Sequence, residues 1–312
     1  MGLETTDSEV PLIGLMLPCE GLVSADGVVS VSRAVEEAGL YSVWVGDHVT
    51  FPVEMTSPNP TMKDGKYPYP MDNPRLEAFT TLAFVAGSTS TIKLGINACV
   101  IPYRNPVLLG KIVSTLDHLS GGRVVFGATL GWCREEFEVL GADFENRVQI
   151  LEEGIGILRT LWEQDQPSYE GKAFRFPSIH IKPKPQQSPM PILMGGQSKP
   201  ALRRAAAIGD GWLGIRLSPE ELKDHVKFLR EERKKSSRAS YPFTVSVNCP
   251  VTLEGEGADG LNLFNTGEVI DFFEKLSEAG ADLVHVVVTS HEPEDLLTAI
   301  GLLEPICKEK QS

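Results

Sequence analysis

The chain has 312 residues, of which 42% are hydrophobic and 23% charged, and its formal net charge at pH 7 is −13. This length and balance are typical of a globular protein that buries a large core. The acidic charge repels phosphate backbones, so we expect no nucleic acid among the partners.

The cysteines and the N-terminus favour a cytoplasmic protein. The chain contains five widely separated cysteines: Cys19, Cys99, Cys133, Cys249 and Cys307. An odd count without a CxxC pair predicts neither a disulfide framework nor a metal site, and fits a reducing compartment. The first ten residues are polar and acidic, and no apolar run is long enough to span a bilayer, so we expect no signal peptide and no membrane association.

Eight short segments rich in apolar and β-branched residues predict buried strands. In chain order they cover residues 13–18, 41–46, 93–99, 123–131, 191–196, 211–216, 243–249 and 282–288. Near-continuous apolar runs of this kind are typical of parallel strands that are covered on both faces. Amphipathic helical stretches fill most of the gaps, the first one with Asp26 as a plausible N-cap.

Eight strand–helix repeats predict an α/β protein with one domain over residues 1–312. We expect a (β/α)8 TIM barrel with insertions at its C-terminal face, and the alternative is a doubly wound sheet. Two connections are unusually long. Residues 49–75 follow the second strand, where a long loop acts as a lid or substrate wall, and residues 164–190 carry a hairpin-like stretch.

The residues at the C-terminal ends of barrel strands converge on one mouth, where barrel active sites lie. The second strand ends in Asp47 and His48, a carboxylate and an imidazole that suit proton transfer, although both could simply hold the following loop. Cys99, at the end of the third strand, is expected to be a small core residue rather than a nucleophile.

Glycines mark the ends of the fourth and fifth strands. Gly131 has no Cβ, so a planar ring could approach the backbone there, and Trp132 could line the mouth or cap the barrel. Gly195 and Gly196 precede Ser198, which looks like the N-cap of a helix. Free N–H groups at such a helix start bind phosphate, and a pair of glycines lets the phosphate come close.

For the remaining polar residues, the sequence predicts lining or structural roles rather than chemistry. Arg216 and Asn248 end strands and could line the pocket, whereas His285 lies inside the eighth strand and reads as a satisfied core residue. Asp117 and Arg123 read as ion-pairing residues of turns and helices without a chemical role.

Several of these pieces occur in the order found in a known family. The run from Asp117 to Arg123, then VVFGATLGW and Glu135-Glu136-Phe137, resembles the signature of luciferase-like monooxygenases. The Asp47-His48 pair, IPYRNP and PILMGGQSKP agree with it, over about residues 12–216. The chain looks most similar to the branch that uses the deazaflavin coenzyme F420 rather than FMN.

The resemblance implies how a cofactor would bind. Its ring would lie over the third strand at Ala98, Cys99 and Val100, with a non-proline cis peptide expected at Ala98–Cys99. Gly131 and Trp132 would also line the cofactor. The phosphate would lie at Gly195, Gly196 and Ser198, while Asp47 and His48 would face the reactive ring carbon.

The resemblance implies hydride transfer between F420 and a small organic substrate. One alternative is an FMN-dependent monooxygenase that uses O2 and receives reduced FMN from a reductase, and another is a non-catalytic flavin-binding protein. A homodimer is expected by analogy. The family's sugar-phosphate dehydrogenases carry a Trp where this chain has Pro52 and an acid where it has Trp132, so their substrate and acid partner are not implied.

Overall fold

The computed structural model describes residues 10–18, 21–62, 64–67, 70–254 and 260–308. Cys19 and both ends of the predicted 1–312 domain lie outside the described residues. The four cysteines that the structure describes are all buried.

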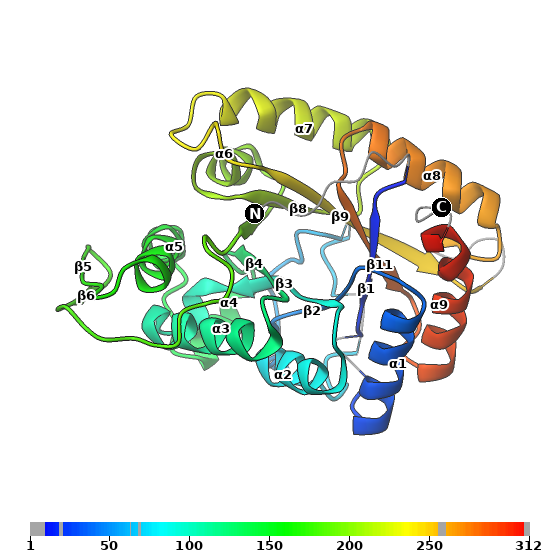
Figure 1. The fold of residues 1–312 in the computed structure, drawn as a ribbon, viewed down its shortest axis with the longest axis horizontal. Helices are drawn as coiled ribbons and strands as arrows, with labels where there is room; N and C mark the ends of the chain where they lie inside the picture. The colour runs from blue at the N-terminus through cyan, green and yellow to red at the C-terminus, as the bar shows by residue number, and fades with distance from the viewer. Residues whose placement is uncertain (1–9, 19–20, 63, 68–69, 255–259, 309–312) are drawn as a thin grey trace.

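All eight predicted strands are present, and they form one closed parallel sheet (Figure 1). They are β1 (Leu12–Met16), β2 (Ser42–Val45), β3 (Lys93–Val100), β4 (Val124–Thr129), β7 (Ile192–Gly195), β8 (Gly211–Ile215), β9 (Thr244–Thr252) and β11 (Leu283–Val288). The sheet closes because β9 pairs with both β8 and β11, and β11 pairs with β1. This closure confirms the TIM barrel and excludes the doubly wound alternative.

Helices surround the barrel strands (Figure 1). They are α1 (Ala25–Glu37), α2 (Ala78–Ser88), α3 (Pro106–Ser120), α4 (Arg134–Val139), α5 (Arg147–Glu163), α6 (Lys199–Ile208), α7 (Pro219–Arg233), α8 (Thr266–Glu278) and α9 (Pro293–Lys308), with the 3-10 turn η1 (Ile101–Tyr103). Within the described residues, no helix has both the length and the apolar character needed to cross a bilayer.

Within the part of the chain that the structure describes, three short strands lie outside the barrel ring. The hairpin-like stretch in 164–190 forms β5 (Tyr169–Glu170) and β6 (Arg175–Phe176), an antiparallel pair that projects beside α5 (Figure 1). The third, β10 (Leu261–Asn262), adds to the edge of β9.

Two local features differ from the prediction. The N-cap of α1 is Ser24, whose side chain accepts a hydrogen bond from Gly27 N, and Asp26 lies in the first turn instead. Helix α2 was not predicted, because its apolar residues do not follow one face: Phe79 and Leu82 are buried, whereas Phe84 is exposed.

The family signature around Asp117 closes the barrel end opposite the mouth. Asp117 is fully buried and accepts hydrogen bonds from Val124 N, Gln186 N and the Gln187 side chain. Arg123 donates to the Thr89 hydroxyl and to several backbone carbonyls. The expected ion pairing of these two residues is wrong, since backbone and amide groups satisfy them instead, but their structural role stands.

His285 lies inside the barrel, completely buried, with both ring nitrogens bonded. The Asn97 amide lies 2.6 Å from its Nε2 and the Ser246 hydroxyl lies 3.0 Å from its Nδ1. Because the amide nitrogen donates to Nε2, Nδ1 carries the proton and donates to Ser246. The Trp44 ring lies 4.8 Å away between centroids. The prediction of a satisfied core histidine is confirmed.

Burial lowers the pKa of His285 to about 3, so the ring stays neutral in the folded protein at pH values where the unfolded chain takes up a proton. Its contribution to stability is therefore complete above the ordinary histidine pKa and is lost as pH falls toward about 3.

We predict that replacing His285 with Asn reduces the acid sensitivity of the fold. Between pH 6 and pH 4, the free energy of unfolding of the native protein should fall more steeply than that of the variant, by up to about 1.4 kcal/mol per pH unit. Urea unfolding followed by circular dichroism at several pH values measures both slopes. Equal slopes would show that His285 is not held neutral.

Candidate active site

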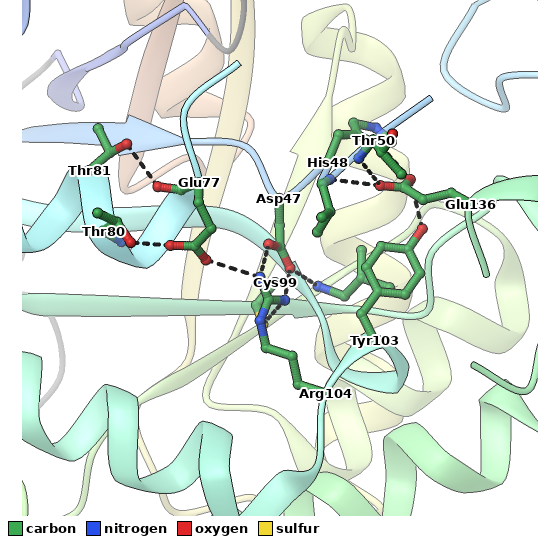
Figure 2. Close-up of polar contacts among 12 residues, drawn as sticks. Asp47, His48, Thr50, Glu77, Thr80, Thr81, Cys99, Tyr103, Arg104 and Glu136 are labelled. Carbon is green, nitrogen blue, oxygen red and sulfur yellow. Dashed lines mark hydrogen bonds and ion pairs between the residues drawn. The ribbon is translucent and has the colours of Figure 1, made fainter. Parts of the chain in front are cut away.

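Asp47, which follows β2, forms a buried ion pair at the mouth (Figure 2). Its side chain is 1% exposed and accepts two hydrogen bonds from Arg104, each 2.7 Å long, and one from Val100 N at 2.8 Å. Arg104 also reaches Glu77, which caps α2. Asp47 thus ties the end of β3 to β2 and α2.

In this ion pair, each charged group favours the ionised form of its partner. Burial raises the pKa of Asp47, and the Arg104 guanidinium opposes that effect. For Arg104, burial lowers the pKa, but the bonds to Asp47 outweigh burial and raise it overall. The two-bond geometry is that of a charged guanidinium–carboxylate pair, so Asp47 acts as an acceptor that positions the strand end.

His48 pairs with Glu136, a buried residue of α4 (Figure 2). Its Nδ1 lies 2.8 Å from the Glu136 Oε2, and its side chain is 19% exposed. The structure therefore does not join the Asp47 and His48 side chains as a proton-transfer pair, because each has a different partner. Among the described residues, no partner is recorded for the His48 Nε2.

Four hydrogen bonds keep Glu136 ionised. Besides His48, it accepts from Val49 N at 2.7 Å, from Thr50 N at 3.2 Å and from the Tyr103 hydroxyl at 2.8 Å. Burial raises the pKa of Glu136, but the bonds from His48, Val49 and Tyr103 outweigh it, and the net shift is downward. A carboxylate at this position accepts the Nδ1 proton and leaves Nε2 for the mouth.

Tyr103 stays protonated beside this carboxylate. Burial raises the pKa of its hydroxyl well above the ordinary value, and the negative charge of Glu136 raises it further. Tyr103 is therefore a fixed donor that holds Glu136 in place.

The expected irregularity in β3 is present, one residue earlier than predicted. The non-proline cis bond joins Asn97 and Ala98, not Ala98 and Cys99. The pairing with β4 shifts register between Ile96 and Cys99, so this segment forms a bulge. Gly127 of β4 leaves room for it, since a Cβ there would lie 2.3 Å from the Ile96 carbonyl oxygen.

Cys99 is buried behind this bulge. Burial raises the pKa of its thiol well above the ordinary value, and the nearby Asp47 charge raises it further. A thiol that resists ionisation is a poor nucleophile, which agrees with the core role expected from the sequence.

Gly131 and Trp132 follow β4 and have different surroundings. Gly131 has a φ of +77°, and a Cβ there would lie 2.6 Å from a Val100 methyl group and 2.8 Å from the Phe137 ring. Packing of the protein itself thus requires this glycine. The Trp132 ring instead faces the mouth, 5.8 Å from the His48 ring between centroids.

The turn after β7 is held by two hydrogen bonds from the protein. Trp212 Nε1 donates to the Gly196 carbonyl at 2.8 Å, and the Gln197 amide donates to the Ile215 carbonyl at 2.9 Å. Gly196 has a φ of +111°, and a Cβ there would lie 2.8 Å from the Ala201 Cβ, so only glycine fits. Ser198 is the N-cap of α6, as predicted.

The predicted cofactor residues follow one side of the mouth. In the sheet, β3, β4, β7 and β8 are consecutive neighbours, so the bulge and the Gly195–Gly196 turn are two strand spacings apart, or roughly 10 Å. Arg216, at the end of β8, is exposed and has a φ of +52°. A strained residue of this kind is typical of functional strand ends.

Reasoning from the sequence missed three residues of the site, namely Tyr103, Arg104 and Glu136. The sequence contained only a weak indication of these roles. Two glutamates in the first turn of a helix that follows β4 are near the mouth, but the sequence does not show that one of them points back toward a histidine 88 residues earlier.

The chain was compared with known protein families and sequences. Residues 14–261 match the family model described as luciferase-like monooxygenase. An uncharacterized protein of Mycobacterium tuberculosis, Rv0940c, is 32% identical over 246 residues, which are 78% of this chain and 82% of that protein. The FMNH2-dependent dimethylsulfone monooxygenase of Pseudomonas putida is 32% identical over 164 residues, 51% of this chain and 44% of that protein.

Solved structures share the fold at low sequence identity. An F420-dependent secondary alcohol dehydrogenase superposes with a TM-score of 0.75 at 17% identity, over 95% of this chain and 98% of that one. The oxygenating constituent of 3,6-diketocamphane monooxygenase from Pseudomonas putida, solved with FMN, gives 0.73 at 16% identity, over 95% and 97%.

Proposed function

We propose that this chain, which belongs to the luciferase-like monooxygenase family, is an oxidoreductase that exchanges a hydride between F420 and a small organic substrate. The observation that carries the proposal is the His48–Glu136 pair at the barrel mouth. A carbonyl that gains a hydride at carbon must gain a proton at oxygen, and His48 Nε2 is placed to provide it.

The residues present fit a flavin-type cofactor. The bulge at Ala98, Cys99 and Val100 would support the ring, with Gly131 and Trp132 beside it. Gly195, Gly196 and Ser198 would hold the phosphate at the start of α6. Ser198 Oγ accepts from Ala201 N and Pro200 has no N–H, so the Lys199 N–H is the first-turn donor that has no acceptor within the helix. When bound, F420 would supply or accept the hydride.

The charged partners of this region have separate tasks in the proposal. Asp47 and Arg104 fix the end of β3 beneath the ring. Glu136 accepts a hydrogen bond from His48 Nδ1 and so orients the ring, and Tyr103 holds Glu136. His48 is thus the catalytic residue. Asp47, which we had expected to take part in catalysis, is a positioning residue instead.

Solved structures of the same fold whose descriptions name F420 support this choice of cofactor. The alternative is an FMN-dependent monooxygenase with a reductase partner, and the relatives whose names include FMN or monooxygenase favour it. A non-catalytic flavin-binding protein is the third possibility, and any turnover would exclude it.

We predict that His48→Asn lowers the rate of reduced F420 oxidation by a panel of ketones about 10²- to 10⁴-fold while F420 still binds. Glu136→Gln should lower kcat with little change in KM, because the variant lacks the carboxylate that accepts the His48 Nδ1 proton and orients the ring. Anaerobic absorbance assays measure both.

Glu153→Gln provides the matched control. Glu153 also accepts backbone N–H groups, at Lys172, Ala173 and Phe174, but it lies on α5 and holds the turn of the outer β5–β6 hairpin. Its variant should keep native kcat. Unchanged turnover in His48→Asn would remove the proposed role of His48, and no turnover in the native protein would favour the binding-protein alternative.

We also propose that a second copy of the chain covers the α2–α3 face. A groove of about 420 Å³ lies between these helices, with Phe79, Ile112 and Leu119 among its lining residues. Leu119 is 77% exposed, Leu108 58% and Phe84 48%, an apolar surface that is large for an uncovered helix pair.

Leu119→Asp should therefore convert a dimer into a monomer in sedimentation velocity, because a carboxylate would be buried without a partner. Leu297→Asp, which changes an exposed leucine of α9, should leave the dimer intact. A monomeric native protein, or a dimer that survives Leu119→Asp, would contradict this interface.

A further inference from the structure

Three polar side chains belong to the floor of the mouth, where the barrel interior becomes accessible. They are Asn97 of β3, Thr129 of β4 and Asn248 of β9, and each residue is part exposed. Inward-pointing side chains one layer deeper, such as Trp44 and His285, are fully buried. Because alternate residues of a barrel strand point inward, the three polar residues form the next layer toward the mouth.

Contacts with the buried His285 show that two of these side chains point inward. The Asn97 amide nitrogen lies 2.6 Å from the His285 Nε2. Asn248 comes two residues after Ser246, whose hydroxyl lies 3.0 Å from the His285 Nδ1. Asn248 therefore points to the same side of β9 as Ser246, which is the interior of the barrel.

Each of the three floor residues has a polar group without a partner in the protein. Among the described residues, no hydrogen bond is made by the Asn97 Oδ1, the Thr129 hydroxyl or the Asn248 side-chain amide, and none of these atoms is both unpaired and buried. They are therefore open to a ligand in the mouth. A Cβ on Gly195 would lie 3.4 Å from the Thr129 hydroxyl, so this group adjoins the glycine turn after β7.

The buried His285 determines which end of the Asn97 amide faces the mouth. Burial lowers the pKa of the ring to about 3, so the ring is neutral and has one donor and one acceptor. Its Nδ1–H donates to Ser246 Oγ, and its Nε2 accepts the Asn97 Nδ2–H. Since the amide nitrogen is held from below, Oδ1, which can only accept, is the end left for the mouth.

Flavin and deazaflavin rings have a polar end that matches these groups. That end is an imide, in which one N–H lies between two carbonyl groups, whereas the opposite end is a benzenoid ring. An imide N–H buried without an acceptor is costly, and each carbonyl needs a donor. The floor provides the acceptor at Asn97 Oδ1 and donors at the Thr129 hydroxyl and the Asn248 amide.

The other side of the mouth suits the benzenoid end. Phe51 and Tyr67 of the 49–75 loop, called the lid here, and Trp132 surround His48, with ring centroids 4.5, 5.7 and 5.8 Å from that of His48. Aromatic faces give an imide little hydrogen bonding. We therefore expect the polar end of the ring to be directed to the floor.

We infer that Asn97 Oδ1 accepts the imide N–H of the cofactor ring, and that His285 is a positioning residue that keeps this oxygen directed at the mouth. The inference rests on the part of the proposed function that places a flavin-type ring on the bulge of β3, where Asn97 directly precedes Ala98. It does not depend on which of the two rings binds, because both carry the imide.

The test compares rings that differ only at the imide nitrogen. The native protein, without cofactor, is titrated by fluorescence with 8-hydroxy-5-deazariboflavin and with its N3-methyl derivative, and then with lumiflavin and 3-methyllumiflavin. We expect each methylated ring to bind about tenfold more weakly, because the methyl group removes the donor and leaves Oδ1 unpaired.

Variants of His285 test its role through this ratio of affinities. His285→Leu should reduce the ratio from about tenfold to about twofold, because the Asn97 amide is then free to turn. His285→Gln should restore it, since a glutamine amide also has one acceptor for Asn97 and one donor for Ser246. A change in packing alone would weaken both ligands equally and leave the ratio unchanged.

Two variants of the floor locate the acceptor. Asn97→Leu should abolish the ratio. Thr129→Val is the matched control, because it removes a polar group from the same floor that has no link to His285, and it should keep the native ratio.

The ¹⁵N NMR spectrum of histidine-labelled protein provides a readout that does not require a ligand. We expect His285 to be a neutral ring with the proton on Nδ1, and we expect its Nε2 resonance to shift in Asn97→Leu. A proton on Nε2 would turn the Asn97 nitrogen toward the mouth and would contradict the inference.

The remaining outcomes separate this inference from the proposed cofactor. Equal affinity for methylated and unmethylated rings would contradict the acceptor, a ratio that survives His285→Leu would contradict the positioning role, and a ratio lost in Thr129→Val would assign the acceptor to Thr129 instead. A tenfold ratio with lumiflavin and no binding of the deazaflavin would support the inference and contradict F420. Binding of neither ring would contradict both.

Discussion

The mouth of this barrel depends on one buried carboxylate. Glu136 joins three segments that are distant in the sequence: the end of β2 through His48, the start of the lid through Val49 N and Thr50 N, and the turn after β3 through Tyr103. A buried charge without partners would be costly. Because four hydrogen bonds satisfy the Glu136 carboxylate, the positions of the three segments depend on one another. The interaction that holds the histidine also holds the loop that covers it.

The two sides of the mouth have different structural features. The strand ends from β3 to β8 provide a bulge, close-packed glycines and a helix start, features that suit a flat ring joined to a phosphate. The side built by the lid and Trp132 is aromatic and faces His48. The Asp47–Arg104 pair lies between them, and it fixes the bulge relative to β2 without contacting His48.

The fold was predictable because each barrel strand is a short apolar run with glycine or polar residues at its ends. Helix α2 was not, because its apolar residues do not follow one face. His48 could be named from its position after a strand, and Ser198 from the glycines before it. Glu136 could not, because its role depends on the path of a loop that begins at Val49, 87 residues earlier. The cis bond was misplaced by one residue, since the register of a bulge depends on tertiary packing against Gly127.

An anaerobic fluorescence titration of the purified protein with F420 and, in parallel, with FMN tests the central proposal most directly. Hydride transfer from the deazaflavin, with His48 as the proton donor, requires that the bulge and the Gly195–Gly196 turn hold the cofactor. Tight binding of F420 with weak binding of FMN is the predicted result. Tighter binding of FMN would contradict it in favour of the monooxygenase alternative, and binding of neither would contradict the cofactor site itself.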